Sequence, residues 1–201
     1  MSEYRLTLPL TADQVKELKV GDVVYLSGRV YQATAAAHQR MLEYLKAGKE
    51  LPFPTKDLGI FHCYTSWRRE GEGYKLNYLG ATTSASVNKY QPEVIARLGI
   101  RVVIGKGGMD AGVLKAMQEN ACVYLAQVGG CSALYSAGVR GIPAVYWEDL
   151  QANLVIALEL DNFGPLTVGM DAHGNSIYAE TEAKVRENIR EAYRIIGALS
   201  A

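Results

Sequence analysis

The chain has 201 residues, 49% of them hydrophobic, and its 21 Lys and Arg residues balance its 21 Asp and Glu residues. This length and apolar content are enough to bury a core without disulfides, so we expect a single domain over residues 1–201. Zero net charge argues against binding to nucleic acid or to a membrane surface through bulk charge. With no leader pattern at the start and no apolar run of about 18 residues, the sequence predicts a cytoplasmic protein.

The sequence of the first half of the chain predicts short helices and strands that end at glycines. A helix is expected after Thr11, because Thr11 and Gln14 have the spacing of a capping box and Leu10 and Val15 that of a hydrophobic staple. The expected helices are 11–21, 34–47 and 92–98, and the expected strands are 22–28, 58–64 and 74–80, with a polar excursion over 65–73.

From residue 101 strands and helices alternate, which is typical of parallel pairing in an α/β layer. Strands are expected at 101–105, 122–125 and 142–147, and helices at 110–121 and after Gly129-Gly130. The tail predicts strands at 153–160, 165–171 and 176–180, the last two joined by a hairpin over 172–175. Thr181 is then expected to cap a final helix with an apolar face of Val185, Ile189, Tyr193, Ile196 and Leu199. Together these elements predict an α/β fold with a mixed sheet flanked by helices.

The three cysteines are Cys63, Cys122 and Cys131. They are widely spaced and lack CxxC or CxxH patterns, so they predict neither a disulfide framework nor a zinc site. We expect buried apolar thiols and no metal site within this chain. Cys131 opens a small-residue helix, which leaves a mildly activated thiol as its alternative.

The stretch 104–110, IGKGGMD, places a lysine and two glycines between an expected strand and an expected helix. Free N–H groups at such a turn attract anions, Gly107 and Gly108 allow close approach, and Lys106 adds a positive charge. A carboxylate or a phosphate would fit there. The stretch lacks the GxxxxGK[ST] pattern, so nucleotide binding is not supported. The alternative is a plain turn with a solvated lysine.

The stretch 80–90, GATTSASVNKY, places Thr82, Thr83 and Ser84 directly after an expected strand. Hydroxyls there can bind an oxyanion, take part in proton transfer or cap a helix. His38, in the alanine-rich helix, is either buried or part of a site. His62 and His173 are weaker candidates.

The order of the motifs resembles the β subunit of class I iron–sulfur fumarases and L(+)-tartrate dehydratases. The resemblance runs from about Leu6 to Tyr178 through GDVVYLSGRVYQATAAAH, GATTSASVNKY, GIRVVIGKGGM, VGGCSALYSAGV and DNFGPLTVGMDAHGNSIY. It implies a swivelling β/β/α fold and a hydro-lyase that adds or removes water on a small hydroxy acid or dicarboxylate. It also implies a [4Fe-4S] cluster held by a partner α subunit, activity only with that subunit, and assembly into a homo-oligomer or heterotetramer.

The resemblance also implies roles for individual residues. Thr82 matches a threonine proposed as the catalytic base, and Lys106 matches a lysine that faces the substrate carboxylate or the departing hydroxyl. The implied substrate-binding residues are His38, Thr83, Ser84, Gly107 and Gly108.

Two carboxylate-binding arginines of the family are replaced here by Thr34 and Ser86, and their acidic neighbours by Ala35 and Asn88. Arg40, Lys89 or the segment 67–70 are the candidates to restore the charge. The loss of two bidentate contacts predicts an altered substrate preference. The alternatives are a non-catalytic binding or regulatory paralogue and, last, a free-standing enzyme that uses Lys106 alone.

Overall fold

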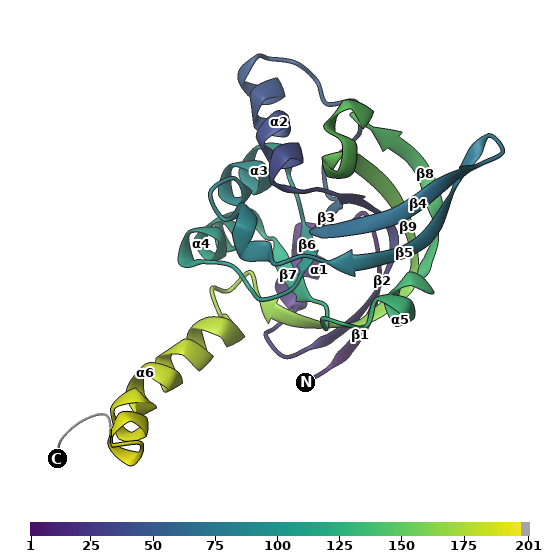
Figure 1. Cartoon of the computed structure of the whole chain (residues 1–201). Helices are drawn as coiled ribbons and strands as arrows, with labels where there is room; N and C mark the ends of the chain where they lie inside the picture. Colours follow the sequence, from purple (N-terminus) through teal and green to yellow (C-terminus); the bar gives the residue numbers. More distant parts are fainter. Residues whose placement is uncertain (198–201) are drawn as a thin grey trace.

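A mixed sheet of seven strands dominates the computed structural model, which describes residues 1–197 (Figure 1). The strand order is β1-β2-β3-β6-β7-β9-β8. The strands are β1 (Glu3–Thr7), β2 (Val23–Gln32), β3 (Gly59–Phe61), β6 (Val102–Gly105), β7 (Val123–Ala126), β8 (Val139–Tyr146) and β9 (Val155–Met170). A separate ribbon is formed by β4 (Cys63–Glu70) and β5 (Gly73–Ala81).

The large sheet closes on itself. Strands β1, β2, β3, β6 and β7 pair in parallel, whereas β9 runs antiparallel to β2, β7 and β8. The pairing of β2 with β9 completes a ring through β3, β6 and β7. The mixed α/β fold predicted from the sequence is therefore confirmed.

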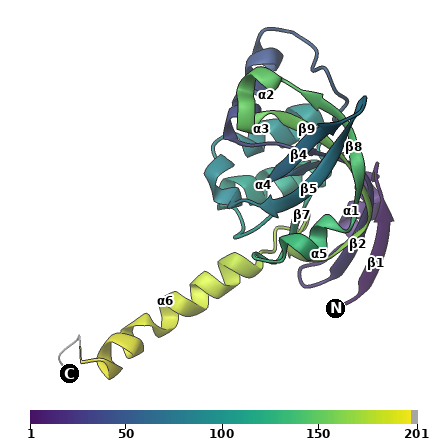
Figure 2. The same cartoon turned by 45° about the vertical axis from the view of Figure 1, so that its right-hand side comes forward.

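The helices are α1 (Ala12–Glu17), α2 (Ala35–Lys46), α3 (Gln91–Leu98), α4 (Ala111–Asn120), α5 (Ser132–Ser136) and α6 (Ile177–Ile195), with 3-10 turns at Ser84–Val87 and Glu148–Asn153. Of these, α2, α3 and α4 cover the outer face of the parallel strands, whereas Val15 of α1 and Tyr135 of α5 pack on the other face. Figures 1 and 2 show α2, α3 and α4 along one side of the molecule and α6 projecting away from the body. No helix in the described part of the chain is long and apolar enough to cross a membrane.

Two hydrophobic clusters lie on the two faces of the sheet. Phe61, Ile104 and Leu125 point into the closed ring, while their neighbours Val103 and Tyr124 point toward the cluster under α2, α3 and α4. Because both faces are covered, β3, β6 and β7 are continuous apolar runs rather than alternating ones. This is why the sequence predicts them as short buried strands.

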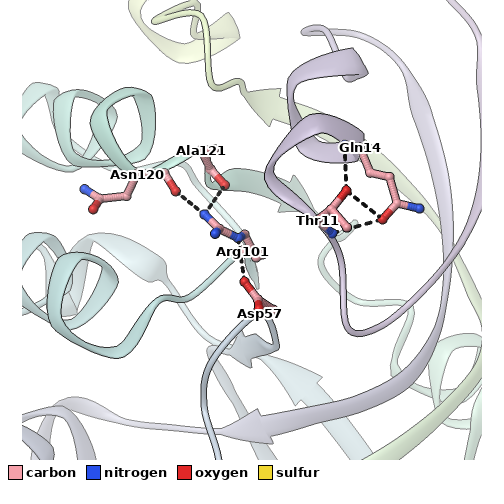
Figure 3. Close-up of polar contacts among 6 residues, drawn as sticks. All are labelled: Thr11, Gln14, Asp57, Arg101, Asn120 and Ala121. Atoms are coloured by element: carbon pink, nitrogen blue, oxygen red, sulfur yellow. Dashed lines mark hydrogen bonds and ion pairs between the residues drawn. The ribbon is translucent and has the colours of Figure 1, made fainter.

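Two local polar arrangements fix the ends of elements (Figure 3). The predicted capping box is confirmed: the Gln14 N–H donates to Thr11 Oγ1 at 3.3 Å, and the Thr11 N–H donates to Gln14 Oε1 at 2.9 Å. Arg101 donates to the Asp57 carboxylate at 2.9 Å and to the backbone carbonyls of Asn120 and Ala121. It thereby ties the loop before β3 to the end of α4.

Two predicted features of the tail are wrong. The strands expected at 153–160 and 165–171 are one strand, β9, because a register shift opposite Leu26 accommodates Pro165, which has no N–H to donate. The strand expected at 176–180 is replaced by α6. The turn of the expected hairpin does form, because the Asp171 carboxylate accepts the N–H groups of His173 and Asn175, but its pairing is limited to one antiparallel bridge between Met170 and Ser176.

The cap of the last helix is also corrected. Ser176, not Thr181, caps α6 and accepts the Ala179 N–H at 3.3 Å, while Thr181 lies inside the helix and donates to the Ile177 carbonyl. Four residues of the predicted apolar face, Val185, Ile189, Tyr193 and Ile196, are exposed to solvent, and the fifth, Leu199, lies outside the described residues.

Two strands in the first half of the chain, β4 and β1, differ from the prediction. The expected polar excursion at 65–73 is mostly strand, because β4 continues to Glu70 and pairs with β5. The Trp67 ring packs edge-on against the Tyr74 ring, with 5.2 Å between the ring centroids, and this contact supports the pairing of β4 with β5. Strand β1 was not predicted.

Replacing Arg101 with methionine is expected to lower the free energy of unfolding by about 1–3 kcal/mol, because partly buried acceptors lose a charged donor. Arg140→Met is the matched control, since the Arg140 and Asp161 side chains are 70% and 47% exposed. Its effect should stay below about 0.5 kcal/mol. Urea denaturation measures both, and equal losses would contradict the role given to Arg101.

Candidate active-site edge

The carboxyl ends of three parallel strands lie side by side. Strand β3 leads into His62, β6 into Lys106 and β7 into Gln127. Backbone bonds continue the ladder beyond the strands: the His62 N–H donates to the Ile104 carbonyl and the Gln127 N–H to the Gly105 carbonyl, both at 2.8 Å. This edge of a parallel sheet is where α/β proteins commonly bind ligands.

The hydroxyl turn reaches the same edge from β5. The Thr82 N–H donates to the His62 carbonyl at 2.8 Å, and the Ser84 N–H donates to the Lys106 carbonyl at 3.0 Å. Thr83 forms an isolated parallel bridge with Lys106. The two turns that the sequence singles out separately are therefore one structure, which local sequence could not predict.

The site residues divide into an exposed and a buried set. Thr82 and Lys106 are half-buried, Thr83 and Gly107 are exposed, and Ser84, Gly108 and His38 are buried. A methyl group added at Gly129 would lie 3.7 Å from Lys106 Cδ, so the lysine stem passes over the third glycine turn. In residues 1–197 no carboxylate oxygen lies within 4.0 Å of Lys106 Nζ, which leaves its charge available to an anion.

Both glycines of the cationic turn adopt positive φ, +81° at Gly107 and +70° at Gly108. Their surroundings differ. A Cβ at Gly108 would lie 2.3 Å from the ring of Tyr178, whereas one at Gly107 would meet only Thr83 Cγ2 at 3.8 Å. Gly108 is thus needed for packing as well as for backbone conformation.

Beneath the turns lies a buried polar group. His62 Nδ1 is 3.0 Å from Ser84 Oγ, and the Ser84 hydroxyl is 2.9 Å from the Tyr124 hydroxyl. The Gln91 amide lies 2.8 Å from His38 Nε2 and 2.9 Å from His62 Nε2. Sequence reasoning ranked His62 low and missed Gln91 and Tyr124. A histidine inside the apolar run LGIFHCY was the one available indication of His62.

Burial keeps these side chains neutral. It lowers the pKa of His62 to about 3, with a smaller contribution from the neighbouring His38 ring. Burial likewise lowers the pKa of His38 below its ordinary value, against the opposing hydrogen bonds to Thr34 and Gln91. Burial raises the pKa of Tyr124. None of these groups is therefore charged near neutral pH.

The candidates for restoring the missing charge are engaged elsewhere. Arg40 pairs with Asp149 at 2.7 Å and lies over the Trp147 ring, and Arg69 pairs with Glu148 at 3.0 Å. The Lys89 ammonium lies 4.5 Å from the centroid of the ring of its neighbour Tyr90.

Thr34 and Ser86 occupy the two positions at which the arginines are absent. Thr34 is at the start of α2, 8% exposed, with its hydroxyl 3.4 Å from the Asn153 carbonyl. Ser86 is exposed and donates to the Thr83 carbonyl at 2.8 Å.

The side chains of this chain do not fit an iron–sulfur cluster. In residues 1–197 no group of three His, Cys, Asp or Glu residues converges on a possible metal position. Cys63 and Cys122 are buried, and burial raises the pKa of each thiol, which disfavours the thiolate that iron requires. Cys131 is partly exposed and stands apart from them in the sequence.

The sequence is similar to known proteins over most of its length. The family model described as Fumarase C-terminus matches residues 2–181. The putative L(+)-tartrate dehydratase subunit beta of Methanocaldococcus jannaschii is 41% identical over 184 residues, covering 90% of this chain and 94% of that protein. The L(+)-tartrate dehydratase subunit beta of Escherichia coli strain K12 is 31% identical over 178 residues, covering 88% and 87%.

A single-chain relative shows the same likeness over part of its length. The putative fumarate hydratase class I of Geobacillus stearothermophilus is 30% identical over 197 residues, which cover 92% of this chain and 35% of that protein.

Gly108→Ala is expected to destabilise the protein by more than about 2 kcal/mol, because the added methyl both strains a left-handed backbone and overlaps Tyr178. Gly107→Ala in the same turn carries only the backbone penalty of about 1–2 kcal/mol. Thermal unfolding of the pair measures the difference. A Gly107 variant that is the less stable of the two would contradict the packing described for Gly108.

Proposed function

Since this chain belongs to the Fumarase C-terminus family, we propose that it is the β subunit of a two-subunit hydro-lyase that adds or removes water on a small hydroxy acid. The observation that carries the proposal is the joining of Thr82 and Lys106 on one sheet edge through the Thr83–Lys106 bridge. A hydroxyl for proton transfer and an uncompensated cation for a carboxylate thereby share one surface. These are the groups that removal of water from a hydroxy acid requires.

The chemistry assigned to this chain is limited to its own side chains. Removal of water breaks a C–H bond beside a carboxylate and the C–O bond on the neighbouring carbon; the C–H electron pair becomes the double bond, and the hydroxyl leaves and takes up a proton to become water. We assign the removal of the C–H proton to Thr82 Oγ1. Negative charge grows on the carboxylate until the hydroxyl has left. Lys106 Nζ and the free N–H groups of the turn at Gly107 and Gly108 are placed to stabilise it. Thr83 binds substrate from the same turn.

The remaining machinery is assigned to a partner. Because the thiols and acidic groups of this chain do not fit a [4Fe-4S] cluster, we assign the cluster to an α subunit that meets this edge. The exposed apolar stripe of Val185, Ile189 and Tyr193 on α6 also supports assembly with further chains. The expected particle is a heterotetramer or a larger oligomer that contains both subunits.

The substrate is proposed to differ from fumarate or malate. The neutral Thr34 and Ser86 leave Lys106 as the cation on the joined turns, so a second carboxylate lacks a bidentate partner. The named relatives include tartrate dehydratase β subunits, which makes a polyhydroxy acid the first candidate. The same two substitutions favour the second candidate function, a non-catalytic binding or regulatory paralogue.

In the complex with its α subunit, Thr82→Ala and Lys106→Ala are each expected to lower turnover at least about 100-fold, because a proton-transfer group or a charged transition-state contact is lost. Lys115→Ala is the control, since Lys115 is 74% exposed on α4. The measurement is kcat/KM for dehydration of tartrate, malate and other hydroxy acids. A wild-type complex that assembles but turns over none of them would favour the paralogue.

The purified chain alone is expected to bind no iron, because Cys63 and Cys122 are buried in clusters on opposite faces of the sheet and burial raises the pKa of both thiols. The measurement is iron and sulfide content after anaerobic reconstitution, with the complex as positive control. About four irons per chain without a partner would overturn the assignment of the cluster to the α subunit.

A further inference from the structure

A continuous row of polar side chains lies beneath the candidate site. It runs from the Thr34 carbonyl through His38, Gln91, His62 and Ser84 to Tyr124, with successive distances of 2.7, 2.8, 2.9, 3.0 and 2.9 Å. His38, Gln91 and Ser84 are 0% exposed, and His62 is 1% exposed. The row therefore belongs to the interior, although its residues come from five elements: α2, the end of β3, the 3-10 turn at Ser84–Val87, α3 and β7.

The first contact fixes the protonation of His38. A backbone carbonyl can only accept, so His38 Nδ1 carries a hydrogen and donates to the Thr34 carbonyl. In residues 1–197 the hydrogen-bond partners of the two rings are a carbonyl, an amide and a hydroxyl, with no carboxylate to stabilise a cation. His38 is thus neutral, and its Nε2 is an acceptor.

An acceptor at His38 Nε2 determines the orientation of the Gln91 amide. The amide nitrogen has no partner when the amide oxygen faces the rings. Turned by 180°, the same amide donates one N–H to His38 Nε2 and the other to His62 Nε2. His62 then carries its hydrogen on Nδ1 and donates to Ser84 Oγ, and the Ser84 hydroxyl donates to Tyr124. Every donor and acceptor in the row is therefore assigned, and donation runs outward from Gln91, through His38 to the Thr34 carbonyl and through His62 and Ser84 to Tyr124.

The row is tied to the two turns at Ser84. Its backbone N–H donates to the Lys106 carbonyl at 3.0 Å, while its hydroxyl fills the space beside Gly105, where an added Cβ would lie 2.0 Å from Ser84 Oγ. The neighbouring residue on one side, Thr83, bridges to Lys106. Ser84 therefore connects the buried row, through its hydroxyl, to the backbone that carries Thr82 and Lys106, through its N–H.

We propose that His38, Gln91, His62 and Ser84 are positioning residues that form a buried hydrogen-bond chain with a fixed donor and acceptor at each contact, which holds Thr82 and Lys106 in register without touching substrate. The proposal rests on the proposed function for its kinetic readout only. It also replaces direct substrate contact as the role of His38 and Ser84, since neither side chain reaches the surface.

The donor and acceptor pattern of the chain is tested by nitrogen-15 NMR of the histidine rings in the whole protein, between pH 6.5 and 8. The sequence has three histidines, which single His→Gln variants assign. His38 and His62 should both be neutral with hydrogen on Nδ1. Neutral His173 should carry hydrogen on Nε2 instead, because its Nε2 lies 2.7 Å from the Lys16 carbonyl. Hydrogen on Nε2 of either buried ring, or a charged buried ring, would overturn the proposal.

The positioning role is tested by Gln91→Met and Gln91→Glu in the complex with the α subunit. Gln91→Met removes the central donor, and kcat should fall at least about 10-fold while KM stays within about 3-fold. Gln39→Met, on the exposed face of α2, is the control and should change neither. Unchanged kcat per folded Gln91→Met complex would overturn the role.

Gln91→Glu restores the size of the side chain but not its two donors, because a carboxylate only accepts. Both rings must then present Nε2–H, and the NMR spectra should show protonated His38 together with a kcat as low as that of Gln91→Met. Wild-type kcat in this variant would overturn the fixed donor and acceptor pattern. If the wild-type complex turns over no hydroxy acid, the proposed function fails, whereas the ring assignments still decide the donor and acceptor pattern of the chain.

Discussion

The backbone hydrogen bond from the Ser84 N–H to the Lys106 carbonyl is the contact on which the candidate site depends. It joins a turn that follows β5 to a turn that follows β6. The β5 turn reaches this edge because the Thr82 N–H also pairs with the His62 carbonyl at the end of β3. Without these bonds the hydroxyls and the lysine would belong to separate surfaces.

The same junction separates two kinds of polar chemistry. Above it, Thr82, Thr83 and Lys106 remain wholly or partly accessible, and Lys106 keeps an uncompensated charge. Below it, Ser84 directs its hydroxyl into an interior where burial keeps the imidazoles neutral. A half-open upper surface suits a site that a second chain completes. A neutral lower layer can hold the turns without titrating near neutral pH.

Sequence reasoning succeeded where the determinants are local. The capping box at Thr11, the apolar runs of β3, β6 and β7, and the glycine turn after Lys106 all depend on residues a few positions apart. It failed where pairing is long-range: the β2–β9 closure and the extension of β4 depend on partners elsewhere in the chain. The tail segment at Ile177 has strand-forming residues, yet the Ser176 cap and the Asp171 turn make it a helix.

The site residues also divide into those with local and those with long-range determinants. The sequence of the two turns was enough to select Thr82, Thr83, Lys106 and the glycines. It was not enough to identify the partners of Ser84. Gln91 and Tyr124 lie on elements whose sequence gives no reason to bring them together, and only the fold places them around His62. Their polar atoms matter because a buried donor without an acceptor is costly.

The central claim is that this sheet edge is half of a site that another chain completes. Backbone hydrogen exchange, measured with and without the α subunit, tests it most directly. The account predicts slower exchange in the complex over residues 82–84, 106–108 and 129–130, and unchanged exchange over the loop 48–56, which follows the C-terminal end of α2. Protection confined to regions away from these three turns, in a complex that is fully assembled, would contradict it.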